Sequence, residues 1–184
     1  MPIVYSAAER FDASSGDSWS RYINWSGLTQ LREVISLDGC LCPSIFQELV
    51  DEDWKYNVHE DFKLHLFLDL DYVLRRVKGT ERVNVLALIE NPTSQDVATL
   101  SVPSFAFRGF DLVDVQGTIS ALVNCGGFPA AFSNSELSEC GLMTDYQRAK
   151  DVQQALREHY PSEPHAMCNL WAVWQMVSDP AFPA

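Results

Sequence analysis

The sequence predicts an α+β domain, or a mixed-sheet α/β domain, with a central sheet and about four to five helices. Three observations lead to this fold class. The 184 residues suit one compact domain, and no internal repeat or low-complexity linker divides them. The chain is 47% hydrophobic and 21% charged, as globular domains are. Segments with helical and with alternating periodicity follow one another irregularly, which is typical of α+β folds.

The N-terminal segment is predicted to lie outside the domain. Residues 1–18 are expected to form a flexible lead-in, because aspartate, serine and glycine gather towards their end. The single domain is then expected to span residues 19–184. Its first strand is predicted over residues 30–37, where Asp38 and Gly39 supply a turn signal after an apolar run.

The following part of the chain predicts two helices and a short strand. Pro43 suits the first position of a helix. Three leucines alternate over residues 63–68 and predict a short strand. A second helix is predicted from Asp69 to Gly79, because apolar residues recur at helical spacing at Leu70, Val73, Leu74 and Val77.

The best-defined strand is predicted at the centre of the sheet. Residues 83–89 are apolar on both faces, as expected of a strand that is covered on both sides. A further strand is predicted over residues 105–112. Within it, Gly109 indicates a bulge that changes the face to which the aromatic side chains point.

The last third of the chain predicts mainly helices. Residues 133–136 form a capping-box pattern at the start of a short helix that ends at Gly141. A longer helix is predicted over residues 146–160, ended by Pro161. Residues 167–177 fit a helix best, although a strand is the alternative there.

Cysteine usage and the N-terminal sequence favour a cytoplasmic location. The five cysteines are odd in number and scattered, which is typical of free thiols in a reducing compartment. No secretory signal and no apolar run of membrane-spanning length is visible. The spacing of Cys40 and Cys42 from His159 and His165 matches no standard zinc site, so we expect neither a metal nor a cofactor.

The net charge of -12 restricts the partners that the protein can have. So acidic a domain repels phosphate backbones and anionic membrane surfaces, whereas a basic protein partner suits its charge. Residues 1–60 carry ten acidic and four basic residues, and residues 91–147 carry six acidic residues and one basic residue. We therefore expect a functional acidic face to come from these two segments.

An acidic and aromatic cluster in the first third of the chain is the predicted partner-binding surface. Carboxylates steer a basic partner towards a surface, while tryptophan and tyrosine supply apolar anchors. The alternative is a solvated helix end with Trp54 in the core. The residues of the predicted surface are Asp51, Glu52, Asp53, Trp54, Tyr56, Glu60 and Asp61.

A pair of aspartates carries the clearest enzymatic motif. The run from Phe67 to Leu74 places Asp69 and Asp71 directly after a predicted strand. It resembles the first motif of haloacid-dehalogenase-type phosphatases, which implies Asp69 as nucleophile and Asp71 as general acid near Mg²⁺. Tyr72 stands where that family prefers glycine, and the family's later acid pair has no counterpart. The other explanation is helix capping, with Asp69 as N-cap and Asp71 in the first turn.

Cys125 is the second catalytic candidate. It precedes Gly126 and Gly127, whose backbone N–H groups could hold an oxyanion while His159 or His165 acts as base. The alternative is a structural thiol beside a glycine turn, because cysteine is among the most buried residue types.

Charge, size and the absence of local catalytic signatures together predict an acidic cytoplasmic protein-binding module. Its most concrete form is an immunity- or antitoxin-like bacterial protein that neutralises a basic toxin or enzyme. The alternative is an enzyme with a non-local active site, either a phosphatase-like hydrolase through Asp69 and Asp71 or a cysteine hydrolase through Cys125. A further alternative is a mimic of nucleic acid that occupies a nucleic-acid-binding protein.

Overall fold

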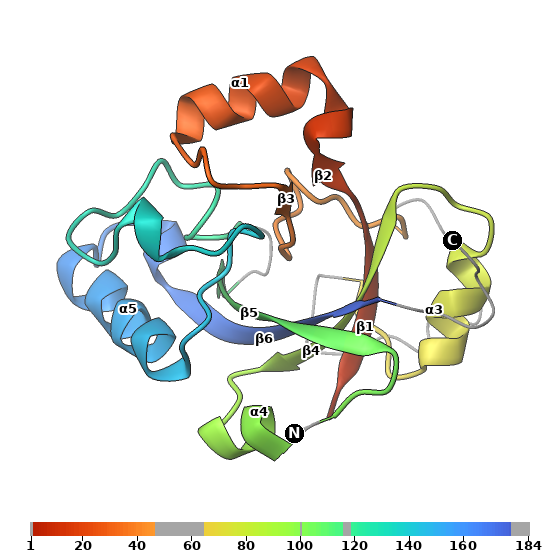
Figure 1. The fold of residues 1–184 in the computed structure, drawn as a ribbon. Helices are drawn as coiled ribbons and strands as arrows, with labels where there is room; N and C mark the ends of the chain where they lie inside the picture. Colours follow the sequence, from red (N-terminus) through yellow and green to blue (C-terminus); the bar gives the residue numbers. More distant parts are fainter. Residues whose placement is uncertain (1, 47–64, 100, 116–118, 178–184) are drawn as a thin grey trace.

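A four-stranded antiparallel sheet forms the centre of the molecule, in the strand order β1-β4-β6-β5 (Figure 1). The computed structural model describes residues 2–46, 65–99, 101–115 and 119–177. The strands, from one edge of the sheet to the other, are β1 (Val4–Glu9), β4 (Val83–Glu90), β6 (Cys168–Met176) and β5 (Phe105–Asp114).

A second, two-stranded sheet pairs β2 (Phe11–Asp12) with β3 (Glu33–Val34). Together with the helices, the two sheets make one mixed α+β domain, which confirms the predicted fold class. The helices in the described part of the chain are α1 (Asp17–Ser26), α3 (Leu70–Val77), α4 (Ser94–Thr99) and α5 (Tyr146–His159).

Two predicted strands occupy the places expected of them. β4 lies inside the sheet between β1 and β6, and its residues from Asn84 to Ile89 are all buried. β5 has its register shift at Gly109, where φ is +140°. A Cβ at this position would lie 2.5 Å from the carbonyl oxygen of Met143, so the bulge needs glycine to let segment 142–143 approach the strand.

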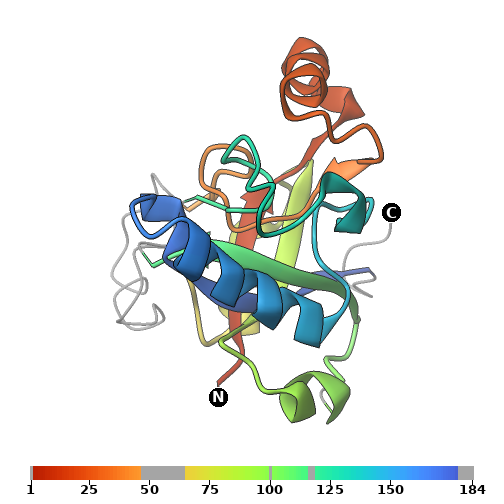
Figure 2. The same cartoon turned by 90° about the vertical axis from the view of Figure 1, so that its left-hand side faces the viewer.

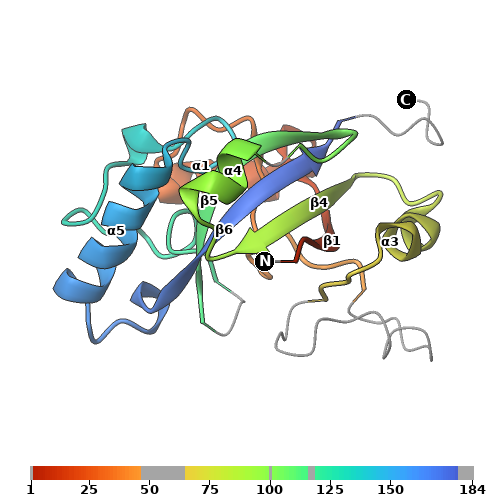
Figure 3. The ribbon, with the colours of Figure 1, turned by 90° about the horizontal axis from the view of Figure 1, so that it is seen from below.

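The two longer predicted helices cover opposite ends of the sheet. α5 packs against β5 and β6, and α3 packs against β1 and β4 (Figures 1 and 3). The buried side of α5 consists of Ala149, Val152, Gln153 and Leu156, and that of α3 of Tyr72, Val73 and Val77. Both stripes recur at helical spacing, which is why the sequence predicts these helices correctly.

The helix preferred for residues 167–177 is wrong, because most of this segment is β6. Leu170, Ala172 and Trp174 pack in one core cluster, while Trp171 and Val173 pack in another. A strand that is buried on both faces loses the apolar–polar alternation that identifies strands. Its apolar residues then also match the spacing of a helix.

The flexible lead-in predicted for residues 1–18 is also wrong. β1 is an edge strand of the central sheet, and Val4, Ala7 and Ala8 are buried in it. The chain continues through β2 and a short 3-10 helix, Ala13–Ser15, into α1, which stands above the sheet at one end of the molecule (Figure 2). The aspartate, serine and glycine near the end of this segment suggested flexibility, but they cap the 3-10 helix and begin α1.

Several shorter predictions hold in part. Of residues 30–37 only Glu33 and Val34 form a strand. The other residues have no regular structure, although some make backbone hydrogen bonds; Ile35 N–H, for example, donates to the Cys140 carbonyl at 3.0 Å. The capping box at residues 133–136 is present, on a 3-10 helix. Within residues 63–68, Phe67 forms an isolated bridge with Tyr5, while residues 63–64 lie outside the described residues. The helix start predicted at Pro43 is wrong, because Ser44 forms an isolated bridge with Ala8 and residues 45–46 form a turn. The rest of that predicted helix lies outside the described residues.

Candidate functional site

Asp69 and Asp71 are placed by the structure as capping residues. The Asp69 carboxylate accepts a hydrogen bond from Asp71 N–H at 2.9 Å, as an N-cap does, and Asp71 lies in the first turn of α3. Both side chains are exposed. Neither lines the groove beside α1 that is described below. The contacts therefore support the capping explanation of this motif.

The environment of Cys125 opposes nucleophilic chemistry. Its thiol contacts the Ser120 carbonyl at 3.4 Å. Burial, together with the nearby carboxylates of Asp38 and Asp114, raises the pKa of Cys125 to about 12. A cysteine nucleophile needs a lowered pKa from a nearby cation. The surroundings of Cys125 are those of a structural thiol.

His165 is oriented by an aspartate, as a catalytic base would be, but not towards the cysteine. Its Nδ1 lies 3.1 Å from a carboxylate oxygen of the buried Asp114. All three residues are described, and no hydrogen bond joins His165 to Cys125. The other predicted base, His159, is exposed at the end of α5. The structure therefore brings an aspartate to His165 without completing a cysteine–histidine pair.

A different pair of aspartates, Asp38 and Asp111, is fully buried. Asp111 accepts hydrogen bonds from the hydroxyls of Ser36 and Ser120, both at 2.6 Å. Asp38 accepts from the N–H groups of Cys40 and Ser120, each at 2.9 Å. The two carboxylates thus tie the loop before Cys40 and the loop at Ser120 to β5.

Burial and the neighbouring Asp38 raise the pKa of Asp111, while its hydrogen bonds oppose this rise. Every oxygen of the pair has hydrogen-bond donors from the protein itself. Asp38 and Asp111 therefore hold loops in place, and each of their carboxylate oxygens already accepts hydrogen bonds from the protein.

A groove lies beside α1. We call it the α1 groove, and it measures about 700 Å³. One wall carries Phe11, Ser18 and Tyr22, from β2 and α1. The opposite side is formed by apolar residues of the loop near Pro43 and by the turn at residues 80–83.

Aromatic packing holds α1 in its place above the sheet. The rings of Phe11 and Tyr22 lie 5.3 Å apart, and those of Phe11 and Trp19 lie 5.4 Å apart, each edge to face. The Tyr22 hydroxyl donates to the Val123 carbonyl at 2.9 Å. These contacts fix α1 to β2 and to the loop at Val123, so the wall of the α1 groove is held in a defined position.

Both arginines that line the α1 groove are already paired. Arg10 forms a two-pronged contact with Glu33, at 2.9 and 3.0 Å. Arg82 lies 3.4 Å from Asp12 and donates to the Ser15 hydroxyl at 3.0 Å. The hydrogen bond from Arg10 is largely responsible for its raised pKa, and a hydrogen bond from Ser14 lowers the pKa of Asp12.

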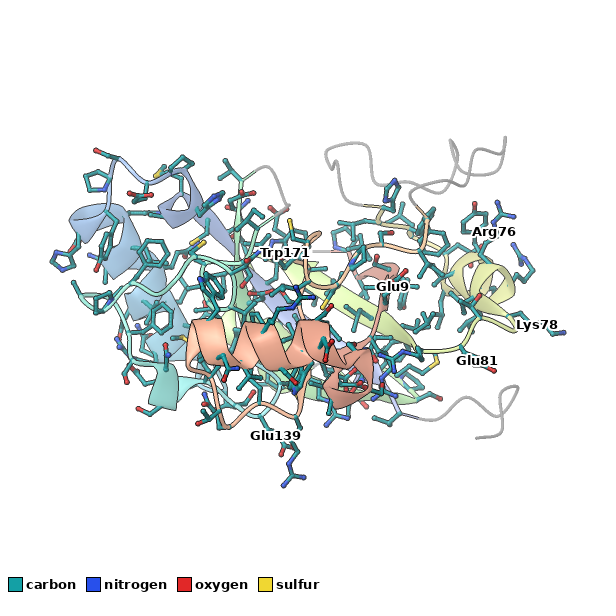
Figure 4. The ribbon with its side chains drawn as sticks, turned by 90° about the horizontal axis from the view of Figure 1, so that it is seen from above. Glu9, Arg76, Lys78, Glu81, Glu139 and Trp171 are labelled. Carbon is teal, nitrogen blue, oxygen red and sulfur yellow. The ribbon has the colours of Figure 1, made fainter. Side chains whose placement is uncertain are left out.

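Two further carboxylates line the same groove, those of Glu9 and Glu81. We call them the rim carboxylates. Both are exposed, and in the part of the chain that the structure describes neither belongs to an ion pair. They lie on the side of α1 that faces α3 (Figure 4). Because the two arginines are neutralised by Glu33 and Asp12, the charge left available at the groove is negative.

The predicted partner-binding residues, Asp51 to Asp61, lie outside the described residues. The acidic face expected from residues 91–147 is diminished, because Asp111 and Asp114 are buried and Glu136 pairs with Arg148. The rim carboxylates gave no sequence signal. Glu9 falls in the segment predicted as lead-in, and only tertiary packing places it in the same groove as Glu81.

No three metal-ligating side chains gather within the described residues, and no helix among them is long and apolar enough to cross a membrane. No protein-family model matches the chain, and comparisons with curated proteins and with solved structures found no match.

Proposed function

We propose that this protein is a binding module that receives a positively charged segment of a partner protein in the α1 groove. The observation that carries the proposal is the charge balance of that groove. Its two arginines are occupied by acidic neighbours, while Glu9 and Glu81 are exposed and form no ion pair with any residue that the structure describes. A cation from another protein is the complement of such a surface.

The net charge of -12 adds a long-range contribution to this local one. A strongly acidic protein attracts basic partners and accelerates their association, in a way that salt weakens. The concrete biological form that we propose is an immunity- or antitoxin-like protein of the cytoplasm, which blocks a basic toxin or enzyme by occupying part of its surface.

The test uses purified basic proteins, beginning with the product of the gene next to that of this chain. Binding to the full-length protein is measured by biolayer interferometry at low and at physiological salt. We expect at least one of these proteins to bind more tightly than about 1 μM. Failure of all of them to reach this affinity would overturn the proposal.

Matched charge reversals localise the interaction. The double variant Glu9→Lys with Glu81→Lys places two cations at the groove and should weaken binding by at least about tenfold. The double variant Glu158→Lys with Glu163→Lys makes the same change in net charge on exposed residues outside the groove. Equal weakening by both pairs would show that net charge alone attracts the partner and would refute the groove as its site.

A further inference from the structure

The α1 groove combines carboxylates with aromatic and aliphatic walls, and this combination suits one kind of cation. Phe11 and Tyr22 line one wall, and Leu41, Pro43 and Ile45 line the other. The rim carboxylates line the same groove as these apolar side chains. A ligand that fits must therefore carry positive charge and also tolerate partial loss of water.

We propose that the α1 groove recognises an arginine side chain of the partner, flanked by apolar residues. This inference rests on the proposed function. A guanidinium group is planar, stacks on aromatic faces and bonds to carboxylates with two parallel N–H groups. Its methylene stem packs against apolar side chains while the charged end stays at the rim.

Lysine is the poorer match for the same groove. Its ammonium group is compact and strongly hydrated, so that moving it beside Phe11 and Leu41 costs more hydration than moving a guanidinium group.

An anionic ligand is disfavoured by the same contacts. Among the described residues, Arg10 and Arg82 are the cations of the groove; Arg10 is held by carboxylates, and Arg82 by a carboxylate, a hydroxyl and a carbonyl oxygen. Counting these carboxylates with the rim carboxylates, the described residues of the groove and their immediate partners include four acidic groups and two guanidinium groups. A phosphate or carboxylate would meet a net repulsion.

The inference is tested with three capped tripeptides that carry arginine, lysine or citrulline between two leucines. Citrulline keeps the shape of arginine without its charge. Each peptide is titrated into the ¹⁵N-labelled full-length protein, and amide shifts report both affinity and location. We expect the arginine peptide to bind about threefold more tightly than the lysine peptide and about tenfold more tightly than the citrulline peptide.

The location of the shifts and the variants complete the test. Perturbed amides should include Glu9 to Ser18 and the turn at residues 80–83. The double variant Glu9→Gln with Glu81→Gln should lose about tenfold in affinity for the arginine peptide. The control Glu158→Gln with Glu163→Gln should leave this affinity unchanged.

Three results would overturn the arginine inference: equal binding of arginine and citrulline peptides, shifts that lie away from the groove, or tighter binding of inorganic phosphate. If a basic protein still binds in a manner that depends on Glu9 and Glu81, the proposed function stands without the preference for arginine. If no basic protein binds, the proposed function itself fails.

Discussion

Two pairs of carboxylates in this molecule have the same chemistry and opposite surroundings. Asp38 and Asp111 are fully buried and surrounded by hydrogen-bond donors of the protein. Glu9 and Glu81 are exposed beside a groove and form no ion pair with any residue that the structure describes. The difference shows that a count of acidic residues does not reveal their role, because burial and available donors decide whether a carboxylate stabilises the fold or remains free to bind.

The largest effect is expected from removing a buried carboxylate. Asp111→Ala leaves the hydroxyls of Ser36 and Ser120 and two backbone N–H groups without their acceptor. We expect the free energy of unfolding to fall by about 3 kcal/mol or more, measured by urea denaturation. The exposed control Glu163→Ala should change it by less than about 0.5 kcal/mol. Similar stability of both variants would show that the buried network is dispensable.

The rim carboxylates should behave in the opposite way. Glu9→Gln and Glu81→Gln each remove a charge that no other described residue neutralises, so the unfolding free energy should change by less than about 0.5 kcal/mol. Affinity for a basic partner should fall by about three- to tenfold per substitution, and less so at high salt. A loss of stability comparable to that of Asp111→Ala would place these residues with the structural carboxylates.

A smaller effect on binding is expected from removing the carboxylate that pairs with Arg10. Glu33→Gln removes the two-pronged partner of Arg10 and leaves it only the longer contact with Asp12 at 3.9 Å, so that the groove becomes less negative. Affinity for the basic partner should fall by about threefold, while the exposed ion pair contributes at most about 1 kcal/mol to stability. Arg10→Gln is the complementary variant and should strengthen binding. An unchanged affinity in both variants would show that the charge of Arg10 does not reach the bound partner.

The smallest expected effect is the pH dependence of the unfolding free energy, which differs between Asp111 and Asp12. The folded pKa of Asp111 is raised, so the stability that its protonated form contributes is present below its unfolded pKa and is lost as pH rises through the folded pKa. The folded pKa of Asp12 is lowered, so its contribution is present above its unfolded pKa and is lost as pH falls through the folded pKa.

Comparison of the wild type with Asp111→Asn and with Asp12→Asn separates the two opposite pH dependences of stability. Unfolding free energies are measured in urea from about pH 3 to pH 7. The advantage of the wild type over Asp111→Asn should shrink as pH rises, whereas its advantage over Asp12→Asn should grow. Parallel profiles for the two variants would contradict the assignment of opposite surroundings to these aspartates.

Local patterns predicted those parts of the fold that rest on neighbouring residues. The helix at Asp69, the helix from Tyr146, the central strand and the bulge at Gly109 all follow from periodicity and from the properties of single residues. The sequence failed at β1, because the serine, aspartate and glycine of residues 12–18 suggested a flexible N-terminal segment, and at β6, whose burial on both faces removed the alternation. It could not locate the α1 groove, since the pairing of β1 with β4 is what places Glu9 and Glu81 in the lining of one groove.

The sequence by itself determined the fold class, the capping role of Asp69 and a net charge that favours basic partners. Only the tertiary structure decided which carboxylates that charge makes available. Asp38 and Asp111 are withdrawn into a hydrogen-bonded interior, whereas Glu9 and Glu81 stay exposed because the arginines beside them are held by Glu33 and Asp12. Charge is a property of composition, but its availability depends on contacts between residues that are distant in the chain.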